Sequence, residues 1–366
     1  MEVKRNVRLI AFYLPQYHPI PENDEWWGKG FTEWTNVVKA KPLFSSHYQP
    51  HLPADLGYYD LRVPEVRSAQ AELARDYGIH GFCYYHYWFN GKRLLDRPFN
   101  EVFSSGEPDF PYCLCWANEN WTRRWDGQDN EILVNQTYSQ EDDLNHIRSL
   151  IPIFADPRYI KIDGKPVFLV YRVNDLPEPR LTAERWRREV RKAGFPGIYL
   201  CSVLSLHTLR FDPNSVGFDA VVDFPPNSTK KHNRYMPLTS RLKMRIKRIK
   251  SDPFIAHRVF DYQWFAEKMA ALSNAPYKIF PAVMPGWDNT PRRQVGGTIF
   301  INSNPTIYGK WLRSDISRVK SRYVGEEQLV FINAWNEWAE GNHLEPDQRW
   351  GHSYLQETYQ AIRDEV

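Results

Sequence analysis

One stretch of the 366-residue sequence contains the repeating unit of its fold: Val63-Pro64-Glu65-Val66-Arg67-Ser68-Ala69-Gln70-Ala71-Glu72-Leu73-Ala74-Arg75-Asp76-Tyr77-Gly78-Ile79-His80-Gly81-Phe82-Cys83-Tyr84-Tyr85. Residues 63–77 have the spacing of an amphipathic helix, with Pro64 in the first turn and Gly78 as a stop signal. Residues 79–85 form a short, almost continuously apolar run, which is typical of a strand buried on both faces. The stretch therefore predicts a helix followed by a buried parallel strand.

Apolar, strand-forming runs of this kind recur along the whole chain. Eight are present: Val7–Leu14, Ile79–Tyr85, Tyr112–Ala117, Val167–Tyr171, Ile198–Val203, Ala220–Phe224, Lys278–Met284 and Leu329–Ala334. Helical patterns lie between most of them, at Val63–Tyr77, Ser139–Phe154, Thr182–Ala193, Thr306–Arg322 and His352–Arg363. Strand and helix in alternation predict an α/β fold, a (β/α)8 TIM barrel. A doubly wound sheet is the alternative, but no glycine-rich nucleotide-binding turn follows a strand.

We expect the whole chain, residues 1–366, to form a single elaborated catalytic barrel. The sequence has no internal repeat and no low-complexity linker that would mark a domain boundary. The helical pattern is weakest at Leu206–Gly217, which is short and polar, and near 229–272, where basic and apolar residues are mixed. An insertion or extended helical region is therefore predicted near 229–272.

Composition excludes several classes of protein. Hydrophobic residues make up 42% and charged residues 25%, the balance of a globular protein with a large core. With 47 Lys and Arg against 44 Asp and Glu, the net charge of +3 is too balanced for an electrostatic nucleic-acid binder. No apolar run approaches the 18 or so residues of a transmembrane segment. The basic stretch 241–250 is either the solvated face of a helix or a peripheral contact with a membrane or an anionic polysaccharide.

The cysteines and histidines bear on location and metal binding. Cys83, Cys113, Cys115 and Cys201 all lie in predicted strands, so we expect buried, reduced thiols and a cytoplasmic location. The N-terminal apolar run is too short for a signal peptide; one removed from this sequence would place the protein in the periplasm or outside the cell. The histidines lack the spacing of a zinc site, so neither a metal nor a cofactor is predicted.

Aromatic and polar residues gather at one end of the predicted strands. In a (β/α)8 barrel the C-terminal strand ends form the face that carries catalytic residues. Aromatic faces beside carboxyl, amide and imidazole groups suit a polysaccharide or oligosaccharide, whose rings offer C–H faces for stacking and hydroxyls for polar contacts. The predicted sugar-binding residues are Tyr13, Gln16, His18, Trp34, Tyr85, His86, Trp88, Trp116, Asn118, Glu119, Tyr171, Trp287, Asp288, Trp335, Asn336 and Trp338.

Two glutamates follow the eighth predicted strand, and we predict that they are catalytic. Glu337 and Glu340 flank Trp338 and lie three residues apart. Two carboxyl groups of unequal burial in one pocket can have separated pKa values and divide the acid and base roles. Glu119 and Glu33 are the next candidates, although each could instead pair with an arginine. The arginines considered as partners are Arg123, Arg124 and Arg172.

Four motifs resemble those of the WbsX-type, glycoside hydrolase family 99-like proteins. They are Gly30-Phe31-Thr32-Glu33-Trp34-Thr35-Asn36, Tyr48-Gln49-Pro50-His51, Leu56-Gly57-Tyr58-Tyr59-Asp60 and Trp335-Asn336-Glu337-Trp338-Ala339-Glu340-Gly341. The resemblance covers almost the whole chain, from Val7 to Tyr359. More distantly, the last motif resembles that of the family 99 endo-α-mannosidases, which are (β/α)8 barrels.

The resemblance implies a retaining glycoside hydrolase in which the two glutamates have separate roles. By position, Glu337 would be the base on the sugar 2-hydroxyl, which attacks C1 and gives a 1,2-anhydro sugar. Glu340 would protonate the leaving group and then activate water. In the more common retaining route a carboxylate attacks C1 directly. The resemblance further implies a manno- or rhamno-configured substrate and is compatible with endo action.

Two other functions stay open. WbsX-type proteins are often called glycosyltransferases because they occur in polysaccharide biosynthesis clusters, so a glycosyltransferase or transglycosylase of O-antigen assembly is one alternative. A non-catalytic carbohydrate-binding barrel is the other. The sequence contains no Asp-x-Asp, no Gly-x-Gly-x-x-Gly and no Gly-Lys-Ser/Thr motif. Their absence favours hydrolysis or transglycosylation over transfer from a nucleotide sugar.

Overall fold

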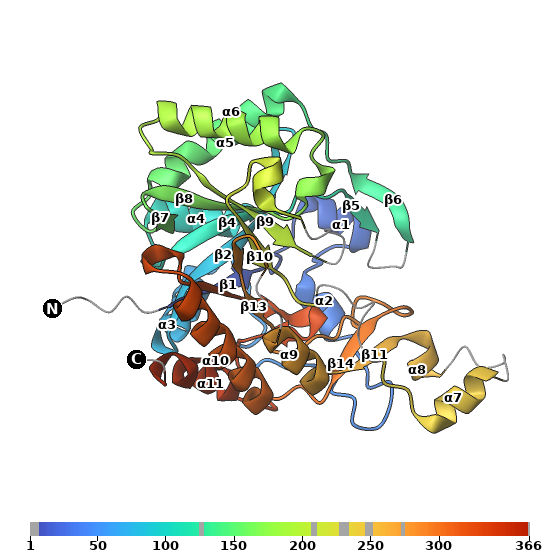
Figure 1. Ribbon diagram of the computed structural model, residues 1–366. Coiled ribbons are helices and arrows are strands. Elements are labelled where there is room, and N and C mark those ends of the chain that lie inside the picture. Colours follow the sequence, from blue (N-terminus) through green and yellow to red (C-terminus); the bar gives the residue numbers. More distant parts are fainter. Residues whose placement is uncertain are drawn as a thin grey trace.

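The computed structural model describes residues 7–123, 128–205, 211–226, 234–245, 252–271 and 275–364. A parallel sheet at its centre curls into a nearly closed barrel with helices around it (Figure 1), which confirms the predicted (β/α)8 fold. The barrel strands are β1 (Arg8–Tyr13), β2 (Ile79–Phe89), β4 (Tyr112–Trp116), β8 (Lys165–Val170), β9 (Tyr199–Leu204), β10 (Ala220–Asp223), β12 (Ile279–Phe280), β13 (Ala282–Val283) and β15 (Leu329–Ile332).

Pro281 divides one strand of the barrel into β12 and β13. The strand order is β12-β10-β9-β8-β4-β2-β1-β15-β13, so these two short strands form the two ends of the sheet. β12 pairs in parallel with β10, and β13 pairs in parallel with β15. Proline has no N–H to donate, but the Pro281 carbonyl accepts a hydrogen bond from the Phe331 amide at 2.9 Å. Segment 279–283 therefore joins both ends of the sheet. Because β12 and β13 together correspond to one predicted strand, the barrel corresponds to the eight predicted strands.

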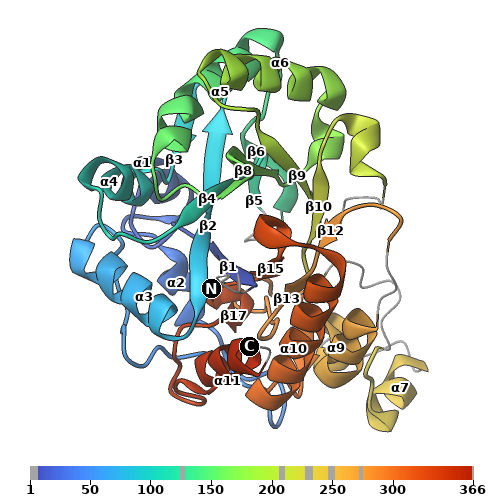
Figure 2. The same ribbon diagram turned by 60° about the vertical axis from the view of Figure 1, so that its left-hand side comes forward.

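Helices surround the barrel (Figure 2); of the following six, five were predicted. They are α3 (Pro64–Asp76), α4 (Arg97–Ser105), α5 (Gln140–Ala155), α6 (Pro179–Lys192), α10 (Pro305–Arg322) and α11 (Ser353–Arg363). Two of them begin at a side-chain cap: the Ser139 side chain accepts from the Asp142 amide at the start of α5, and Asn304 accepts from the Ile307 amide at the start of α10. The helix missed by sequence reasoning, α4, is only nine residues long and begins at an Arg-Pro pair.

The region near 229–272 departs from a plain barrel unit. Its described parts form α7 (Leu238–Arg245), α8 (Pro253–Ala256), β11 (Arg258–Asp261) and α9 (Tyr262–Ala270). β11 pairs in parallel with β14 (Thr298–Ile301) outside the barrel, and α7 and α8 project away from it (Figure 1). An insertion within a single domain stays a prediction, as does membrane contact through 241–250, of which residues 246–250 lie outside the described residues.

The interior of the barrel is apolar, as expected for strands covered on both faces. Every residue of β4, β9 and β15 is buried. All four cysteines are buried, and none forms a disulfide. Among the described residues, no helix combines the length and apolar character needed to span a membrane.

Short elements after the strands build up the C-terminal face of the barrel. They are α1 (Pro21–Trp27), α2 (Glu33–Val37), β3 (Lys92–Leu94), β5 (Trp121–Arg123), β6 (Gln128–Val134), β16 (Asn336–Glu337) and β17 (Asn342–His343). β2 and β3, β5 and β6, and β16 and β17 form antiparallel hairpins. At the opposite end, the short strand β7 (Lys161–Ile162) pairs with the start of β8.

Candidate active site

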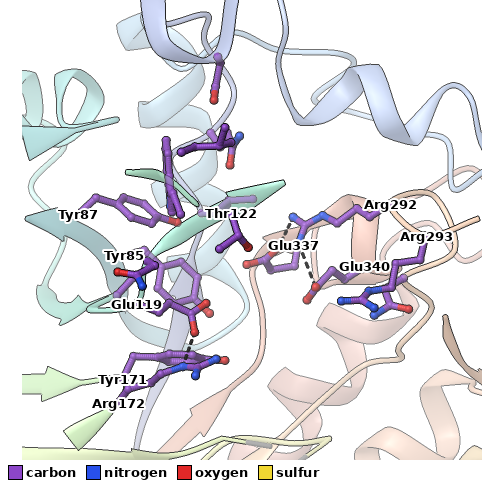
Figure 3. Close-up of a pocket in the computed structure, with 18 of the residues that line it drawn as sticks. Tyr85, Tyr87, Glu119, Thr122, Tyr171, Arg172, Arg292, Arg293, Glu337 and Glu340 are labelled. Carbon is purple, nitrogen blue, oxygen red and sulfur yellow. Dashed lines mark hydrogen bonds and ion pairs between the residues drawn. The ribbon is translucent and has the colours of Figure 1, made fainter. Parts of the chain in front are cut away.

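A pocket of about 290 Å³ lies at the C-terminal ends of the barrel strands. This is the face on which (β/α)8 enzymes carry their catalytic residues. Figure 3 shows its two walls: Tyr85, Tyr87 and Glu119 on one side, and Glu337 and Glu340 on the other. Further polar and aromatic residues of the lining are Gln16, Asn23, Trp26, Trp27, Asn120, Trp121, Thr122, Tyr171, Arg172, Phe224, Trp287, Asn289, Arg292 and Arg293.

Arg292 binds both glutamates of the acidic wall. Its Nη1 donates to Oε1 of Glu340 at 2.9 Å, and its Nη2 donates to Oε2 of Glu337 at 3.2 Å. The same Nη2 also donates to Oε1 of Glu33, whose side chain is fully buried. Three carboxylates thus surround one guanidinium, so acidic groups outnumber the cation that they share.

This arrangement raises the pKa of both pocket glutamates. Burial raises the pKa of Glu337 well above its ordinary value; Arg292 opposes the shift, while Glu340 and Glu33 add to it. Burial also raises the pKa of Glu340, with Arg292 again opposing and Glu33 reinforcing the shift. The cluster therefore keeps a proton at higher pH than an isolated carboxyl group would, which is a requirement for a general acid near neutral pH.

Local backbone structure holds the two glutamates in place. Glu337 lies in β16, opposite Asn342 of β17, and a short 3-10 helix carries the chain to Glu340. The Glu340 carbonyl accepts a hydrogen bond from the Asp288 amide at 2.6 Å. Gly341 then turns the chain with φ of +56°, and a Cβ at this position would lie 3.2 Å from the Asp288 side chain. A glycine after Glu340 thus fits both the turn and the close packing.

The opposite wall presents aromatic rings. The Tyr87 and Trp121 ring centroids lie 5.4 Å apart, and Trp26 of α1 packs edge-on against Trp121 at 5.8 Å. Such rings offer flat apolar faces to a ligand that also has polar edges. Beside them Glu119 forms an ion pair with Arg172, one of the three arginines considered from the sequence. Glu33 instead pairs with Arg292, which sequence reasoning did not single out.

The pocket brings together some of the predicted sugar-binding residues and not others. Those that line it are Gln16, Tyr85, Glu119, Tyr171 and Trp287, together with both predicted catalytic residues, Glu337 and Glu340. The remaining predicted residues do not line it: Tyr13, His18, Trp34, His86, Trp88, Trp116, Asn118, Asp288, Trp335, Asn336 and Trp338.

Strand alternation explains His86 and Trp88. β2 extends to Phe89, four residues beyond the predicted strand, because it pairs with β3. Side chains alternate between the faces of a strand, so Tyr85 and Tyr87 face the pocket and their neighbours face the helices. The Nε2 atoms of His86 and His146 lie 2.9 Å apart, and Trp88 stacks on the His146 ring at 4.7 Å.

Tyr13 and Trp116 end barrel strands but are directed toward the helices. The Tyr13 hydroxyl donates to Gln70 of α3 at 2.7 Å. The Trp116 indole donates to the Trp88 carbonyl at 3.1 Å and packs against Trp186 of α6. Both side chains are therefore part of the layer between barrel and helices.

Asn118 and Asn336 connect the ends of neighbouring strands. The Asn118 side chain accepts from the Arg172 amide at 2.7 Å and donates to the Arg172 carbonyl at 2.9 Å. In the same way, Asn336 accepts from the Leu14 amide at 2.7 Å and donates to the Leu14 carbonyl at 3.0 Å. Each side-chain amide therefore bonds to backbone groups that lie beyond the paired part of a barrel strand, and so it does not face the pocket.

The other residues outside the pocket also have internal partners. Asp288 accepts hydrogen bonds from His47 at 2.6 Å, from Gln49 and from Thr290. The Trp338 indole donates to buried Glu345 at 2.6 Å, and the Trp34 indole donates to the Tyr59 carbonyl. Nδ1 of His18 lies 3.1 Å from the Pro15 carbonyl, and Trp335 packs against Phe82 of β2. These side chains support the loops around the pocket.

Comparison with known proteins identifies the family. The sequence model of a family described as "Glycosyltransferase WbsX" matches residues 9–358. This chain belongs to the WbsX family. Protein WxcX of Xanthomonas campestris pv. campestris, strain B100, is 45% identical over 354 residues, which are 97% of this chain and 49% of WxcX; the homologue in strain ATCC 33913 gives the same values. The WbsX-family chain thus spans about half the length of these relatives.

Solved structures resemble this WbsX-family chain in fold. A glycoside hydrolase-like protein has a TM-score of 0.58 at 16% identity, over 99% of this chain and 95% of its own. The GH99 endo-α-mannosidase from Bacteroides thetaiotaomicron, in complex with bis-tris propane, has a TM-score of 0.57 at 15% identity, over 98% and 96%. At such identities the likeness establishes the barrel architecture alone.

Sequence reasoning missed several pocket residues of this WbsX-family chain. Arg292 lies in a loop after β13 that has no helical or strand periodicity, and its partner Glu33 is 259 residues away. The signal that could have indicated Arg292 is charge. Two glutamates buried near a strand end are expected to have a cationic side chain close by. Tyr87 could have been found from the alternation that already selected Tyr85. Trp26 lies in α1, away from any predicted strand end, whereas Trp121 follows the third predicted strand but was not selected as a sugar-binding residue.

Proposed function

We propose that this chain is a glycoside hydrolase that uses Glu337 and Glu340 to cleave a manno- or rhamno-configured polysaccharide or oligosaccharide. The observation that carries the proposal is the sharing of Arg292 by the two glutamates on one wall of the pocket. A single guanidinium reaches both carboxylates, so both can act on one glycosidic bond. The aromatic wall opposite supplies faces on which a sugar ring can stack.

The electrostatics of the pair suit a division into acid and base. Glycoside hydrolysis needs one carboxyl group that is protonated and one that is ionised. Burial favours the protonated form of both glutamates, whereas Arg292 favours the ionised form. Because burial and Arg292 act in opposite directions on each pKa, the pair is suited to having one member protonated while the other is ionised.

We propose a retaining reaction in which Glu337 is the base and Glu340 the general acid. Glu337 would take the proton of the sugar 2-hydroxyl, whose oxygen attacks C1 as the C1–O bond to the leaving group breaks. Glu340 would donate its proton to that leaving oxygen and then accept one from the water that attacks C1. As the C1–O2 bond of the 1,2-anhydro ring breaks, Glu337 would return its proton to the 2-oxygen, which restores both glutamates. In the other retaining route, a carboxylate attacks C1 directly. Both routes give net retention and require both glutamates.

Polar residues of the pocket are proposed to bind the sugar hydroxyls. Gln16 and the Glu119–Arg172 pair lie at different strand ends and offer both donors and acceptors. Tyr85, Tyr171 and Trp287 are proposed to stack on sugar rings or to donate hydrogen bonds. The similarity in fold to an endo-α-mannosidase supports a manno-configured sugar as the first substrate to test.

A glycosyltransferase or transglycosylase of polysaccharide assembly is the second candidate. It is favoured by the description of the family, "Glycosyltransferase WbsX". The relatives are about twice as long as this chain, so a whole protein of that length has room for a further activity. The pocket itself contains two glutamates that share Arg292, a set that suits acid–base catalysis on a glycosidic bond.

The proposal is tested by incubating the chain with α-mannans, rhamnose-containing O-antigens and host glycans, and measuring new reducing ends. A parallel set contains nucleotide sugars as donors. Reducing ends released without a donor would support hydrolysis. Turnover only with nucleotide sugars would establish the transferase alternative. Binding without turnover, unchanged in Glu337→Gln and Glu340→Gln, would establish a non-catalytic carbohydrate-binding barrel.

A further inference from the structure

Three side chains that can bind metals meet behind the hairpin that carries Glu337. His51 comes from the loop that precedes α3, His343 lies in β17, and Asp347 follows in the next loop. Nδ1 of His51 lies 2.8 Å from Nε2 of His343, and that Nε2 lies 4.0 Å from Oδ2 of Asp347. All three possible ligand atoms lie within 4.8 Å of one another. The cluster is separate from the pocket, whose lining includes none of these residues.

The hydrogen bonds of His343 fix which nitrogen is available. Its Nδ1 lies 2.9 Å from the Glu345 carbonyl, and a carbonyl oxygen can only accept, so Nδ1 carries the proton. The Nε2 lone pair is therefore directed at His51. The His343 ring is held flat against Trp338, with the ring centroids 3.7 Å apart and the planes 11° apart. Metal-binding histidines commonly use the second nitrogen in this way, to donate to a backbone carbonyl.

The carboxylate of Asp347 is also fixed, and its charge is buried. Only 3% of this residue is exposed. Its Oδ2 accepts from the Tyr48 hydroxyl at 2.9 Å, while its Oδ1 accepts from the Arg349 and Trp350 amides at 3.0 and 2.6 Å. These three donors are uncharged groups. A cation beside Oδ2 would offset the cost of burying the negative charge.

The simplest account of the cluster is a hydrogen bond from His51 Nδ1 to His343 Nε2. That bond satisfies the two imidazoles but does not include Asp347, whose Oδ2 lies 4.0 Å from the same nitrogen and accepts from the Tyr48 hydroxyl. A cation placed between the three atoms engages all of them at once. His51 would then carry its proton on Nε2, so that both facing nitrogens present lone pairs.

We propose that His51, His343 and Asp347 bind a divalent transition-metal ion, with Zn²⁺ the best match. Two imidazole nitrogens and one carboxylate oxygen suit zinc, whereas calcium and magnesium prefer oxygen ligands alone. Water would complete a four-coordinate site. Nitrogens that both lie about 2.0–2.1 Å from a tetrahedral zinc ion are farther apart than the present 2.8 Å. The two rings must therefore separate by about half an ångström on binding.

The metal site would connect the β16–β17 hairpin, which carries Glu337, to the loop before α3. Asn336 pairs with His343, and Glu337 pairs with Asn342, so a ligand bond to His343 acts one residue from Glu337. The loop that carries His51 is already joined to the Asp347 segment, because the Ala54 amide donates to the Pro346 carbonyl at 2.9 Å. A metal ion there has a structural role, and it needs no part in the chemistry of the pocket.

The sequence predicted no metal, since its histidines lack the spacing of a zinc site. His51 and His343 are 292 residues apart, and only the fold brings them together. A spacing rule detects sites whose ligands share a local segment. Such a rule cannot detect ligands that lie far apart in the sequence.

The experiment measures Zn²⁺ binding to the full chain after chelation and dialysis, by elemental analysis and by thermal unfolding. His51→Gln and Asp347→Asn remove ligands. His352→Gln is the matched control, because His352 also bonds a carboxylate, Asp55 at 2.6 Å, but lies outside the cluster. We expect about one ion per chain in the parent and control, a higher unfolding temperature with Zn²⁺, and at least about tenfold weaker binding in both ligand variants.

A second measurement uses only the parent chain, so it tests the proposal even if the ligand variants fail to fold. Co²⁺ added to the zinc-free parent is expected to give the intense visible absorption of a four-coordinate site, which EDTA removes. Zinc content near zero in the parent, equal binding in His51→Gln and the parent, or only the weak spectrum of hydrated Co²⁺ would overturn the proposal. These readouts do not depend on the hydrolase assay, so failure of one proposal leaves the other intact.

Discussion

Arg292 donates a hydrogen bond to Glu340 across 2.9 Å, from a loop 48 residues away in the sequence. Through its other terminal nitrogen it also contacts Glu337 at 3.2 Å. The guanidinium is therefore the main charge that opposes burial at the proposed catalytic pair, because it lowers the pKa of both carboxyl groups.

Replacing Arg292 by Gln is expected to shift the pH dependence of activity to higher pH. Without the guanidinium, the pKa values of Glu337 and Glu340 rise further, so the base ionises only at higher pH. The acid limb of the kcat/KM profile reports this ionisation. Arg292→Lys keeps a positive charge and should shift the limb less. Profiles of both variants that coincide with the parent would show that Arg292 does not control the pair.

The alternation of β2 predicts opposite effects for adjacent residues. Tyr87 faces the pocket, so Tyr87→Val should raise KM about 2- to 10-fold, the equivalent of about 0.5–1.5 kcal/mol of aromatic contact. His86 faces His146 in the helical layer, so His86→Asn should lower the unfolding temperature and leave KM unchanged. Steady-state kinetics and thermal unfolding of the two variants separate these effects. A raised KM in His86→Asn with normal stability would contradict the assignment.

Asn336→Ala should destabilise the fold by about 1–3 kcal/mol, because the buried Leu14 amide and carbonyl each lose a hydrogen-bond partner. Chemical denaturation gives this free energy of unfolding. Asn214→Ala is the control: Asn214 is exposed, and its loss should change stability by less than about 0.5 kcal/mol. Equal effects of the two substitutions would show that Asn336 does not hold the strand ends together.

Glu345 is expected to make stability fall as pH rises above 4.5. Burial raises its pKa from 4.5 to about 7 in the folded protein, although hydrogen bonds from Trp338, Gln70 and Tyr59 favour the ionised form. Between these pH values the folded state binds more protons than the unfolded state, so the free energy of unfolding decreases, by up to about 1.4 kcal/mol per pH unit. Glu345→Gln should remove this contribution. Denaturation of parent and variant at pH 5, 6 and 7 checks it; parallel pH dependences would contradict it.

The barrel was predictable from the sequence because its strands are covered on both faces. Such strands are continuous apolar runs, and each of the eight runs became a barrel strand, including the one that Pro281 divides. The boundaries were less predictable where pairing extends a strand. β2 continues through Tyr87, Trp88 and Phe89 and pairs there with β3, whereas the predicted strand ended at Tyr85 although these aromatic residues also favour a strand.

The pocket was predictable only in part, since a strand-end position does not specify a side chain's direction. Tyr85 and Trp287 line the pocket, whereas His86 and Asn336 follow or end strands but contact the helices or the backbone. Arg292 could not be assigned to the glutamates because only the closed barrel brings its loop to them. Direction and long-range charge pairing are properties of the fold rather than of any local pattern.

Glu337 and Glu340 are proposed to act together in hydrolysing a glycosidic bond. The most direct test is the rate of reducing-end release from an α-mannan or O-antigen polysaccharide, for the parent, Glu337→Gln and Glu340→Gln. Glu357→Gln is the control, because Glu357 pairs with Arg313 on the outer helices. We predict release by the parent and control, and a loss of about 10²–10⁴-fold in each pocket variant at unchanged unfolding temperature. Equal rates in all four proteins, or turnover that appears only with a nucleotide sugar, would contradict the account.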